Sequence, residues 1–342
     1  MNLDSSLRLA LRLTYYHRKD DVIIVVMGMS GSGKSSFINQ FHTNRPVRIG
    51  HGLASCKTYV ALWKLYYLMI NIGTNKVEIY QCRDDEFGNF WLMDTPGFYN
   101  TSRSAIEVLG EIIAWLNRLY LEKVQLTGIL YVHSIRETRI GTKAEHSLQL
   151  FNKLCGTNAL RKVVLVSTFW DTIDPLEGDI REQELKENPH LWDDILKYGS
   201  RVFRHYNHLT AKAVIRQLFL DIKEIDDRGT YLRIQCEMVD EYRRLAHTDA
   251  GQVLAKILMY QRLVSEHKLT RLQAELQEPH AQRHPEHSKH LEELRRDTEE
   301  GQRRHAEDAI YMEADSEGLM RLVWKRGALE AVEEQRKEEK KT

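Results

Sequence analysis

Residues 25–37, VVMGMSGSGKSSF, combine an apolar run, a loop of glycine and serine, and a lysine followed by two hydroxyl side chains. The spacing G-x-x-x-x-G-K-S is met by Gly28, Gly33, Lys34 and Ser35. Glycine lets such a loop wrap closely around phosphate oxygens, and the loop amides then meet a helix N-terminus that favours anions. The pattern predicts a phosphate-binding loop, or P-loop, rather than a turn that only links a strand to a helix.

The side chains of this loop have separable roles. Its predicted nucleotide contacts are Gly28, Ser30, Gly31, Ser32, Gly33, Lys34, Ser35 and Ser36. We expect the Lys34 ammonium to bridge β- and γ-phosphate oxygens and so to act in catalysis. The Ser35 hydroxyl is expected to ligate Mg²⁺. Because ATPases, kinases and GTPases all use such a loop, the base must be identified elsewhere in the chain.

The stretch FWLMDTPGF, residues 90–98, carries a D-x-x-G pattern after an apolar run. Asp94, at the end of a buried strand, is expected to hold a Mg²⁺-bound water. Gly97 is expected to offer its amide to the γ-phosphate, because no Cβ blocks the approach. By itself the pattern is typical of an ordinary turn, but behind a P-loop it favours a nucleotide site.

A base-reading segment is predicted in KVVLVSTFWD, residues 162–171. Thr168 and Asp171 stand where guanine-binding proteins carry [N/T]-K-x-D. A carboxylate at Asp171 would accept hydrogen bonds from the N1 and N2 donors of guanine, a donor pair that adenine lacks. Phe169 occupies the position of the motif lysine, which lies along the base plane, and an aromatic face stacks there instead.

This base-reading prediction has an alternative, in which Asp171 only caps the helix that follows. A fainter match is Thr210-Ala211-Lys212, at the start of an apolar-periodic helix, where the S-A-K loop that backs the base would fall. The base assignment therefore depends mainly on Asp171.

Short apolar runs alternate with longer mixed segments from residue 21 to about residue 225. The runs are VIIVVM, NFWLM, TGILYVH, KVVLVST and RVFRHY, and the segments between them include 34–42, 102–121, 143–155 and 210–222. Apolar runs of about four to seven residues are typical of strands buried on both faces and joined by crossover helices. The sequence predicts an α/β fold, the P-loop NTPase three-layer sandwich with a mainly parallel central sheet.

Residues 226–342 are expected to form a charged helical tail, because Glu, Gln, Lys, Arg and His dominate and no strand-like run occurs. Two prolines, Pro279 and Pro285, predict a break near 279–287. The a/d spacing of a coiled coil, without sustained heptads, is found in Leu269, Leu272 and Leu276. A coiled coil and a solvated helical arm that packs one side on the globular domain both stay open.

Composition narrows the class of protein. Forty-nine basic and 49 acidic residues balance, which argues against a nucleic-acid partner. The four cysteines lie far apart without metal-ligand spacing, so we expect free thiols and a cytoplasmic location. Residues 1–20 predict a short leader helix rather than a signal peptide, and 61–73 is too short and too charged for a transmembrane segment.

Five segments together resemble a known family: GMSGSGKSS, IGHGLASC, MDTPGFYNT, TGILYVHSI…LFNKLCG and STFWD. In this order and spacing they are similar to the fungal G-domain-containing proteins close to the immunity-associated nucleotide-binding GTPases and to the septins (paraseptins). The resemblance covers about 21–255, and similar proteins carry a charged helical or coiled-coil tail. It implies binding of GTP or GDP with Mg²⁺ at Lys34, Ser35, Asp94 and Gly97.

The switch I threonine of this family follows a GHxLxSxT segment, where Thr58 and, less well, Ser55 are the candidates. Thr58 is expected to coordinate Mg²⁺ and to present its amide to the γ-phosphate, and so to act in catalysis. An apolar stretch, 59–75, follows where similar proteins pass to a strand. It represents either an added element that covers a sheet edge or unspliced sequence, and an insertion there would displace switch I.

Taken together, these residues favour a GTP-binding switch or assembly module with slow hydrolysis, because Phe98 replaces the water-orienting Gln of many small GTPases. Acceleration is then expected from a homo-oligomer, through the G domain or the tail, or from a protein effector of unknown identity. The main alternative is a scaffold that holds GTP without turnover and associates through its tail. A kinase or ATPase is disfavoured by Asp171 and by the lack of a second substrate site.

Overall fold

The apolar runs form one six-stranded sheet in the structure, a computed structural model that describes residues 22–41, 77–98, 103–137, 141–225, 229–278 and 285–339. The strands are β1 (Ile23–Gly28), β2 (Glu78–Asp84), β3 (Gly88–Asp94), β4 (Gly128–Ser134), β5 (Val163–Thr168) and β6 (Arg201–Arg204). Their order is β2-β3-β1-β4-β5-β6, and all neighbours are parallel except β2 and β3. β1, β4 and β5 are buried at every residue, as strands covered on both faces require.

The strand register brings the predicted site segments to one edge of the sheet. Val26 pairs with Asp94, and Ser134 pairs with Thr168. Because β1, β3, β4 and β5 run in the same direction, their carboxyl ends and the loops that follow them gather at that edge. The P-loop, the D-x-x-G segment and the TFWD segment therefore converge.

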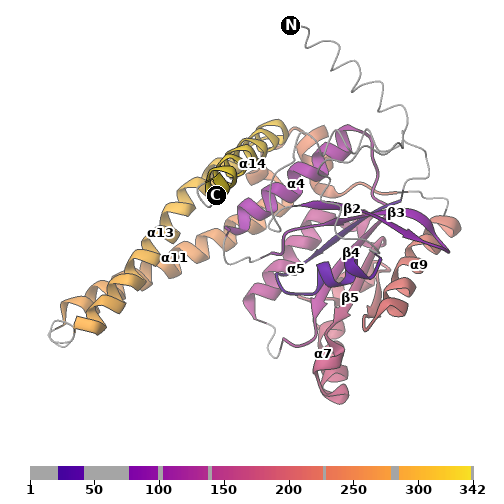
Figure 1. Cartoon of the computed structure of the whole chain (residues 1–342), viewed down its shortest axis with the longest axis horizontal. Helices are drawn as coiled ribbons and strands as arrows, with labels where there is room; N and C mark the ends of the chain where they lie inside the picture. Colours follow the sequence, from indigo (N-terminus) through magenta and orange to yellow (C-terminus); the bar gives the residue numbers. More distant parts are fainter. Residues whose placement is uncertain are drawn as a thin grey trace, which may run out of the picture.

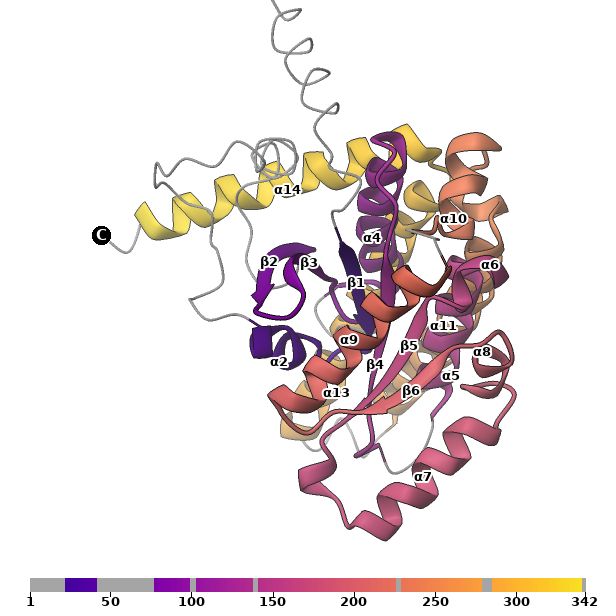
Figure 2. The same cartoon turned by 90° about the vertical axis from the view of Figure 1, so that its right-hand side faces the viewer.

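Helices cover both faces of the sheet (Figure 2). They are α2 (Lys34–Ile38), α4 (Ala105–Leu121), α5 (Thr142–Cys155), α6 (Thr157–Leu160), α7 (Pro175–Glu187), α8 (Asp193–Lys197), α9 (His208–Ile225), α10 (Arg233–Gln235), α11 (Asp249–Gln277), α13 (Pro285–Met312) and α14 (Ser316–Glu339). One buried cluster joins the sheet to α4 and α5, and a second joins its other face to α2 and α9. The predicted three-layer α/β sandwich with a mainly parallel sheet is confirmed.

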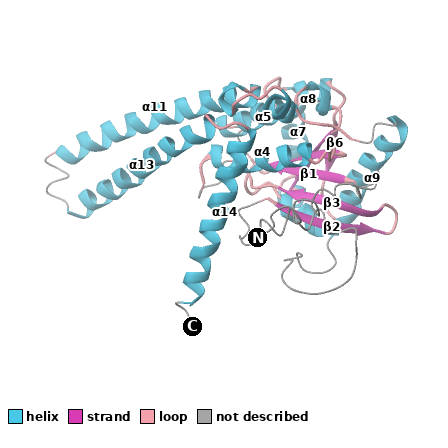
Figure 3. Cartoon of the chain, turned by 90° about the horizontal axis from the view of Figure 1, so that it is seen from above, coloured by secondary structure: helices cyan, strands magenta, loops and turns pink. Residues whose placement is uncertain are grey.

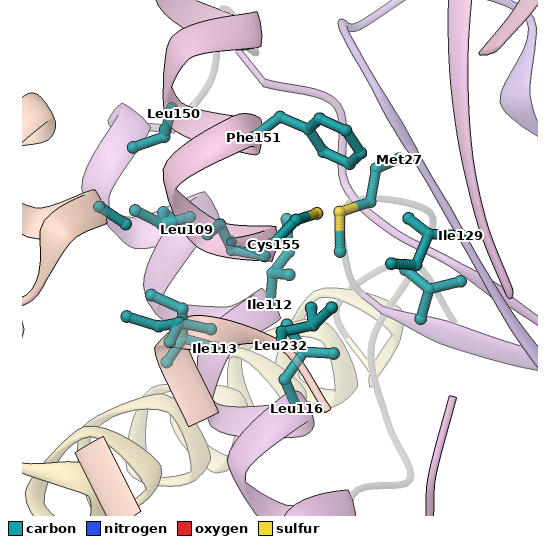
Figure 4. Close-up of a cluster of buried hydrophobic side chains, with 14 of the residues drawn as sticks. Met27, Leu109, Ile112, Ile113, Leu116, Ile129, Leu150, Phe151, Cys155 and Leu232 are labelled. Atoms are coloured by element: carbon teal, nitrogen blue, oxygen red, sulfur yellow. The ribbon is translucent and has the colours of Figure 1, made fainter. Parts of the chain in front are cut away.

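The larger cluster shows how the region after residue 226 contributes to the core (Figure 4). Met27 of β1 and Ile129 of β4 lie in it with Phe151 and Cys155 of α5. Leu232, which precedes α10, is fully buried in the same cluster. Burial of this kind stabilises each side chain by about 1.5–3 kcal/mol, so the first part of this region is held to the sheet domain by packing.

The described residues 229–278 and 285–339 are mostly helical, and α11 and α13 lie side by side as an arm that projects from the domain (Figures 1 and 3). A small apolar cluster near the far end of the arm joins Leu272 to Leu291, with Leu276 and Leu294 packed on it. Helix α14 then returns to lie across α4, where Asn117 Nδ2 donates to Ser316 Oγ at 3.1 Å. The break predicted near 279–287 falls partly on 279–284, outside the described residues.

Several other predictions fall outside the described ranges. They concern the leader helix at 1–20, the switch I candidates Ser55 and Thr58, and the stretch 59–75. Among the helices that the structure describes, none has the length and apolar character needed to cross a membrane.

Candidate functional site

The predicted P-loop joins β1 to α2. Gly28 ends the strand, and Gly33 has a left-handed backbone with φ of 94°, which serves as the N-cap conformation of α2. A side chain is disfavoured at this φ, so glycine fits the position. The loop side of the site is open, since Ser30, Gly31, Ser35 and Ser36 are exposed. Ser32 is buried, and its amide donates to the Met29 carbonyl at 3.2 Å.

Lys34 is 7% exposed and folds back over its own loop. Its Nζ donates to the Met29 carbonyl at 2.8 Å and to the Gly28 carbonyl at 3.3 Å. Burial lowers the pKa of Lys34 to about 8, and the charge of Asp94 opposes that change. The loop thus holds a desolvated ammonium, whose charge is stabilised by Coulomb attraction when an anion approaches.

Ser35 and Asp94 are brought together as the sequence predicts. The Ser35 hydroxyl donates to Asp94 Oδ2 at 2.8 Å. Burial raises the pKa of Asp94, while the Ser35 hydrogen bond and the Lys34 charge lower it. Asp94 Oδ1 is buried without a hydrogen-bond partner in the described part of the chain. A carboxylate oxygen without a hydrogen-bond partner, next to a hydroxyl, is a pair of hard oxygen ligands. Such oxygens can ligate Mg²⁺ or accept a hydrogen bond from a Mg²⁺-bound water.

The segment after Asp94 lies directly on the P-loop. The Phe98 amide donates to the Gly28 carbonyl at 3.2 Å, and the Ser30 amide donates to the Phe98 carbonyl at 3.1 Å. A Cβ on Gly97 would stand 2.4 Å from the Ser30 nitrogen, so only glycine fits this approach. The Phe98 side chain is 2% exposed and belongs to the core cluster with α4.

Thr168 ends β5 and ties the P-loop to the sheet. Its hydroxyl is within hydrogen-bonding distance of two carbonyls, that of Ser32 at 2.7 Å and that of His133 at 3.1 Å. Thr168 is 3% exposed, so in this conformation its side chain supports the loop from behind. This explains in physical terms why a β-branched hydroxyl residue fits the first position of the TFWD segment.

Asp171 lies in a short 3₁₀ turn, 170–172, and is exposed. The cap of α7 is Asp174, whose Oδ1 accepts the amides of Leu176 and Glu177 at 3.0 and 3.2 Å. The cap alternative for Asp171 is therefore unnecessary, since the helix already has an N-cap. Asp171 stays available as an exposed carboxylate at the edge of the sheet where the P-loop lies.

The Thr210–Lys212 match does not form a base-backing loop. Thr210 lies in the first turn of α9, where its hydroxyl accepts the amides of Tyr206 and Asn207. Lys212 pairs with Asp84 at 3.0 Å, on the β2–β3 hairpin. The loop that directly follows β6 is 205–207, and sequence spacing alone missed it because β6 ends at Arg204, earlier than the apolar run suggests.

Sequence reasoning also missed the support beneath Asp171. Trp170 is 6% exposed, and the Arg204 guanidinium lies 4.0 Å from its ring centroid. Glu182, on α7, pairs with Arg204 at 2.7 Å. A Cβ on Gly178 would stand 2.6 Å from the Trp170 ring. These residues come from three separate elements, so no local sequence signal marks them.

No family model matches the chain, and no curated protein matches it. Among solved structures, Toc33 from Arabidopsis thaliana in complex with Mg²⁺ and GMPPNP is similar over 67% of this chain and 96% of that chain, with 14% identity and a TM-score of 0.43. Elongation factor SelB from Methanococcus maripaludis with the GTP analogue GppNHp is similar over 63% of this chain and 35% of that chain, with 13% identity and a TM-score of 0.36. The G domain of the T. maritima FeoB iron transporter is similar over 59% of this chain and 99% of that chain, with 15% identity and a TM-score of 0.33.

Proposed function

We propose that this chain binds GTP with Mg²⁺ and hydrolyses it slowly, as a switch or assembly module. The observation that carries the proposal is the buried, partnerless Oδ1 of Asp94 beside the Ser35 hydroxyl and the Lys34 ammonium. A buried carboxylate oxygen without a partner costs free energy, which a cation and its water would recover. The donor set fits Mg²⁺, and the desolvated ammonium beside it fits phosphate.

The residues of the site divide the work. The P-loop amides and Lys34 hold the β- and γ-phosphates, and Gly97 brings its segment against the loop. Ser35 and Asp94, with Thr58 as a further predicted ligand, hold Mg²⁺, which when bound neutralises charge on the phosphate oxygens. Asp171 accepts from the guanine edge, and Thr168 keeps the loop in place.

Slow turnover follows from Phe98. Its ring is buried in the core and carries no hydrogen-bonding group, so it cannot orient an attacking water. We therefore infer that acceleration comes from a polar or cationic group supplied by a second copy of the chain or by a protein effector. The finer relationship, to fungal G-domain proteins near the immunity-associated GTPases and septins, belongs to the same proposal, as does a division into residues 1–20, 21–225 and 226–342.

A GTP-bound scaffold without turnover is the second candidate, and the projecting α11–α13 arm favours it because an arm offers surface for association. The nucleotide retained by purified protein separates these functions. Mixed GTP and GDP supports the switch, intact GTP the scaffold, and ATP or ADP contradicts both. Single-turnover hydrolysis should rise with protein concentration, whereas a fast rate in dilute monomer would place the catalytic group within one chain.

The magnesium role has its own test. Ser35→Ala should weaken GTP binding more in the presence of Mg²⁺ than in its absence, because the hydroxyl contacts the cation. Ser265→Ala, on α11 and outside the predicted site, is the matched control and should leave GTP binding unchanged. Equal losses with and without Mg²⁺ in Ser35→Ala would contradict the metal role.

A further inference from the structure

Phe169 stands where the [N/T]-K-x-D pattern has a lysine, and its surroundings show what replaces that cation. The residue has a left-handed backbone with φ of 65°, directly after β5. A Cβ built on Gly33 would stand 3.5 Å from Phe169 Cε2, so this edge of the ring faces the P-loop at Gly33. The aromatic ring therefore lies beside the P-loop, at the carboxyl end of β5.

Arg136 covers one face of that ring. Its guanidinium carbon lies 3.8 Å from the Phe169 ring centroid, which is a cation–π contact. Arg136 is exposed and comes from the segment after β4, two residues beyond the strand end at Ser134. Arg136 forms no ion pair with a carboxylate of the described residues, so its charge faces the ring and solvent.

The backbone holds this stack in place from both sides. The Ile135 amide donates to the Thr168 carbonyl at 3.1 Å, which places residues 136 and 169 next to each other across the strand ends. Arg181 of α7 donates to the Ile135 carbonyl at 2.9 Å and fixes the same segment from outside. The Arg136–Phe169 stack is thus a product of two neighbouring strand ends and not of a flexible surface contact.

We propose that Arg136 is a nucleotide-binding residue that supplies, from a different strand, the cation that the motif lysine supplies elsewhere. This inference rests on the proposed function. The guanidinium of Arg136 is planar, so one face stacks on Phe169 while the other is presented to the purine base of the bound nucleotide. Phe169 acts as the platform that orients it.

This assignment explains how the site keeps a cation although Phe169 replaces the motif lysine. A phenylalanine at the lysine position carries no charge, and Arg136 supplies a flat cationic group at the same place on which the base can stack. An arginine on an apolar ring is more weakly hydrated than a lysine and loses less on approach of a base. Stacking on a base also distinguishes this role from a phosphate contact, because stacking requires the base to be present.

The experiment measures the affinity of the full-length chain for GTP and for inorganic triphosphate. Arg136→Ala should weaken GTP binding by about tenfold and leave inorganic triphosphate binding within about twofold. Arg262→Ala, an exposed arginine on α11 that pairs with Glu266, is the matched control and should change neither affinity. Because Arg136 is exposed, the melting temperature of the nucleotide-free protein should stay unchanged.

A second substitution tests the exchange of roles. Phe169→Lys in the Arg136→Ala background restores the motif lysine and should recover GTP affinity to within about threefold of the unmodified chain. Unchanged GTP affinity in Arg136→Ala, equal losses for GTP and triphosphate, or failure of the rescue would each overturn the assignment. If the unmodified chain binds no GTP, the proposed function itself fails, which is a different result from an insensitive Arg136.

Discussion

The phosphate end and the base end of the candidate site are built in different ways. The phosphate end, around Gly28–Ser35, is a single contiguous loop whose geometry is fixed by backbone hydrogen bonds and glycine. The proposed base end draws on side chains of separate segments, which include Arg136, Phe169 and Asp171. Backbone recognition of phosphate requires fixed spacing, whereas side-chain recognition of a base can be met by several combinations.

This difference predicts how substitutions behave. At the phosphate end a change should remove binding of every nucleotide, because all of them carry the same phosphates. At the base end a change should alter which nucleotide binds, with smaller losses in affinity. Each of the following tests either separates the two ends further or shows that they act as one.

Lys34→Ala should produce the largest effect, a loss of GTP affinity of at least about 100-fold, because charge-assisted bonds to two phosphates are removed. The protein should still fold, since the buried ammonium contacts loop carbonyls and not the apolar core. Titration with fluorescent GTP, together with thermal melting, measures both.

Lys212→Ala is the matched lysine control. Lys212 pairs with Asp84 on the β2–β3 hairpin, away from the P-loop, so its removal should leave GTP affinity unchanged. Unaltered GTP binding in Lys34→Ala would contradict the P-loop assignment, and an equal loss in both variants would indicate a general effect of surface charge.

Asp171→Asn should shift preference from GTP toward xanthosine triphosphate, with a change in relative affinity of about 10- to 100-fold. The amide supplies a donor where the xanthine ring has an acceptor, while the phosphate end is untouched. Asp174→Asn makes the same chemical change three residues away, where asparagine still caps α7, and should alter no preference. If ATP competes equally with GTP in the unmodified protein, the guanine assignment fails.

The affinity for GTP should fall by about tenfold per pH unit above pH 8 and change little between pH 7 and 8. Burial lowers the pKa of Lys34 to about 8, and the phosphates bind its protonated form. Without nucleotide, the effect of pH on the free energy of unfolding has the opposite sign. Between pH 8 and the ordinary lysine pKa of 10.5, the unfolded chain binds more protons at Lys34 than the folded chain, so this residue makes stability rise with pH.

Calorimetry across pH 7–10 measures both the change of GTP affinity with pH and the change of stability with pH. Lys34→Ala should remove the contribution of this residue to the stability slope, and Lys34→Arg should make residual binding insensitive to pH because arginine stays protonated. A GTP affinity that does not change up to pH 9.5 would contradict a phosphate contact by an ammonium of this pKa.

The sequence could predict the sheet and the phosphate end because both follow local rules. Mostly apolar runs identify β1, β4 and β5, and the glycine–lysine spacing identifies the loop between β1 and α2. The Ser35–Asp94 contact follows as well, since parallel strand ends meet at one edge. The packing of Leu232 in the main core had no such signal, because the composition of 226–342 predicts a charged tail and the apolar residues around Leu232 form no strand-like run.

The base end could be predicted only in part. Asp171 follows from its place in a known spacing, but the Arg136–Phe169 stack requires knowledge of which strands are neighbours. The support of Trp170 by Arg204 and Glu182 depends in the same way on β6 and α7 meeting β5. Contacts between distant segments carry no periodicity, so a single sequence does not reveal them.

The smallest expected effect is that of Phe98→Gln on hydrolysis. In many small GTPases a Gln at this position orients the attacking water, and its presence speeds hydrolysis there. Here the Phe98 side chain is 2% exposed and points into the core with α4, while only its backbone meets the P-loop. A glutamine would therefore bury an amide away from the phosphates. We expect a single-turnover rate within about twofold of the unmodified protein and a loss of stability of about 1–3 kcal/mol.

Phe98→Leu is the control that removes the ring without adding an amide. It should match the hydrolysis rate of Phe98→Gln and lose less stability, because no polar group is buried. Comparing the two variants separates the cost in stability of burying an amide from the cost of removing the ring. An acceleration of about tenfold or more in Phe98→Gln alone would show that the side chain reaches the nucleotide after all. The backbone contacts of Gly28 and Ser30 with Phe98 would then belong to a segment that rearranges when GTP binds, and the phosphate end would no longer be the rigid half of the site.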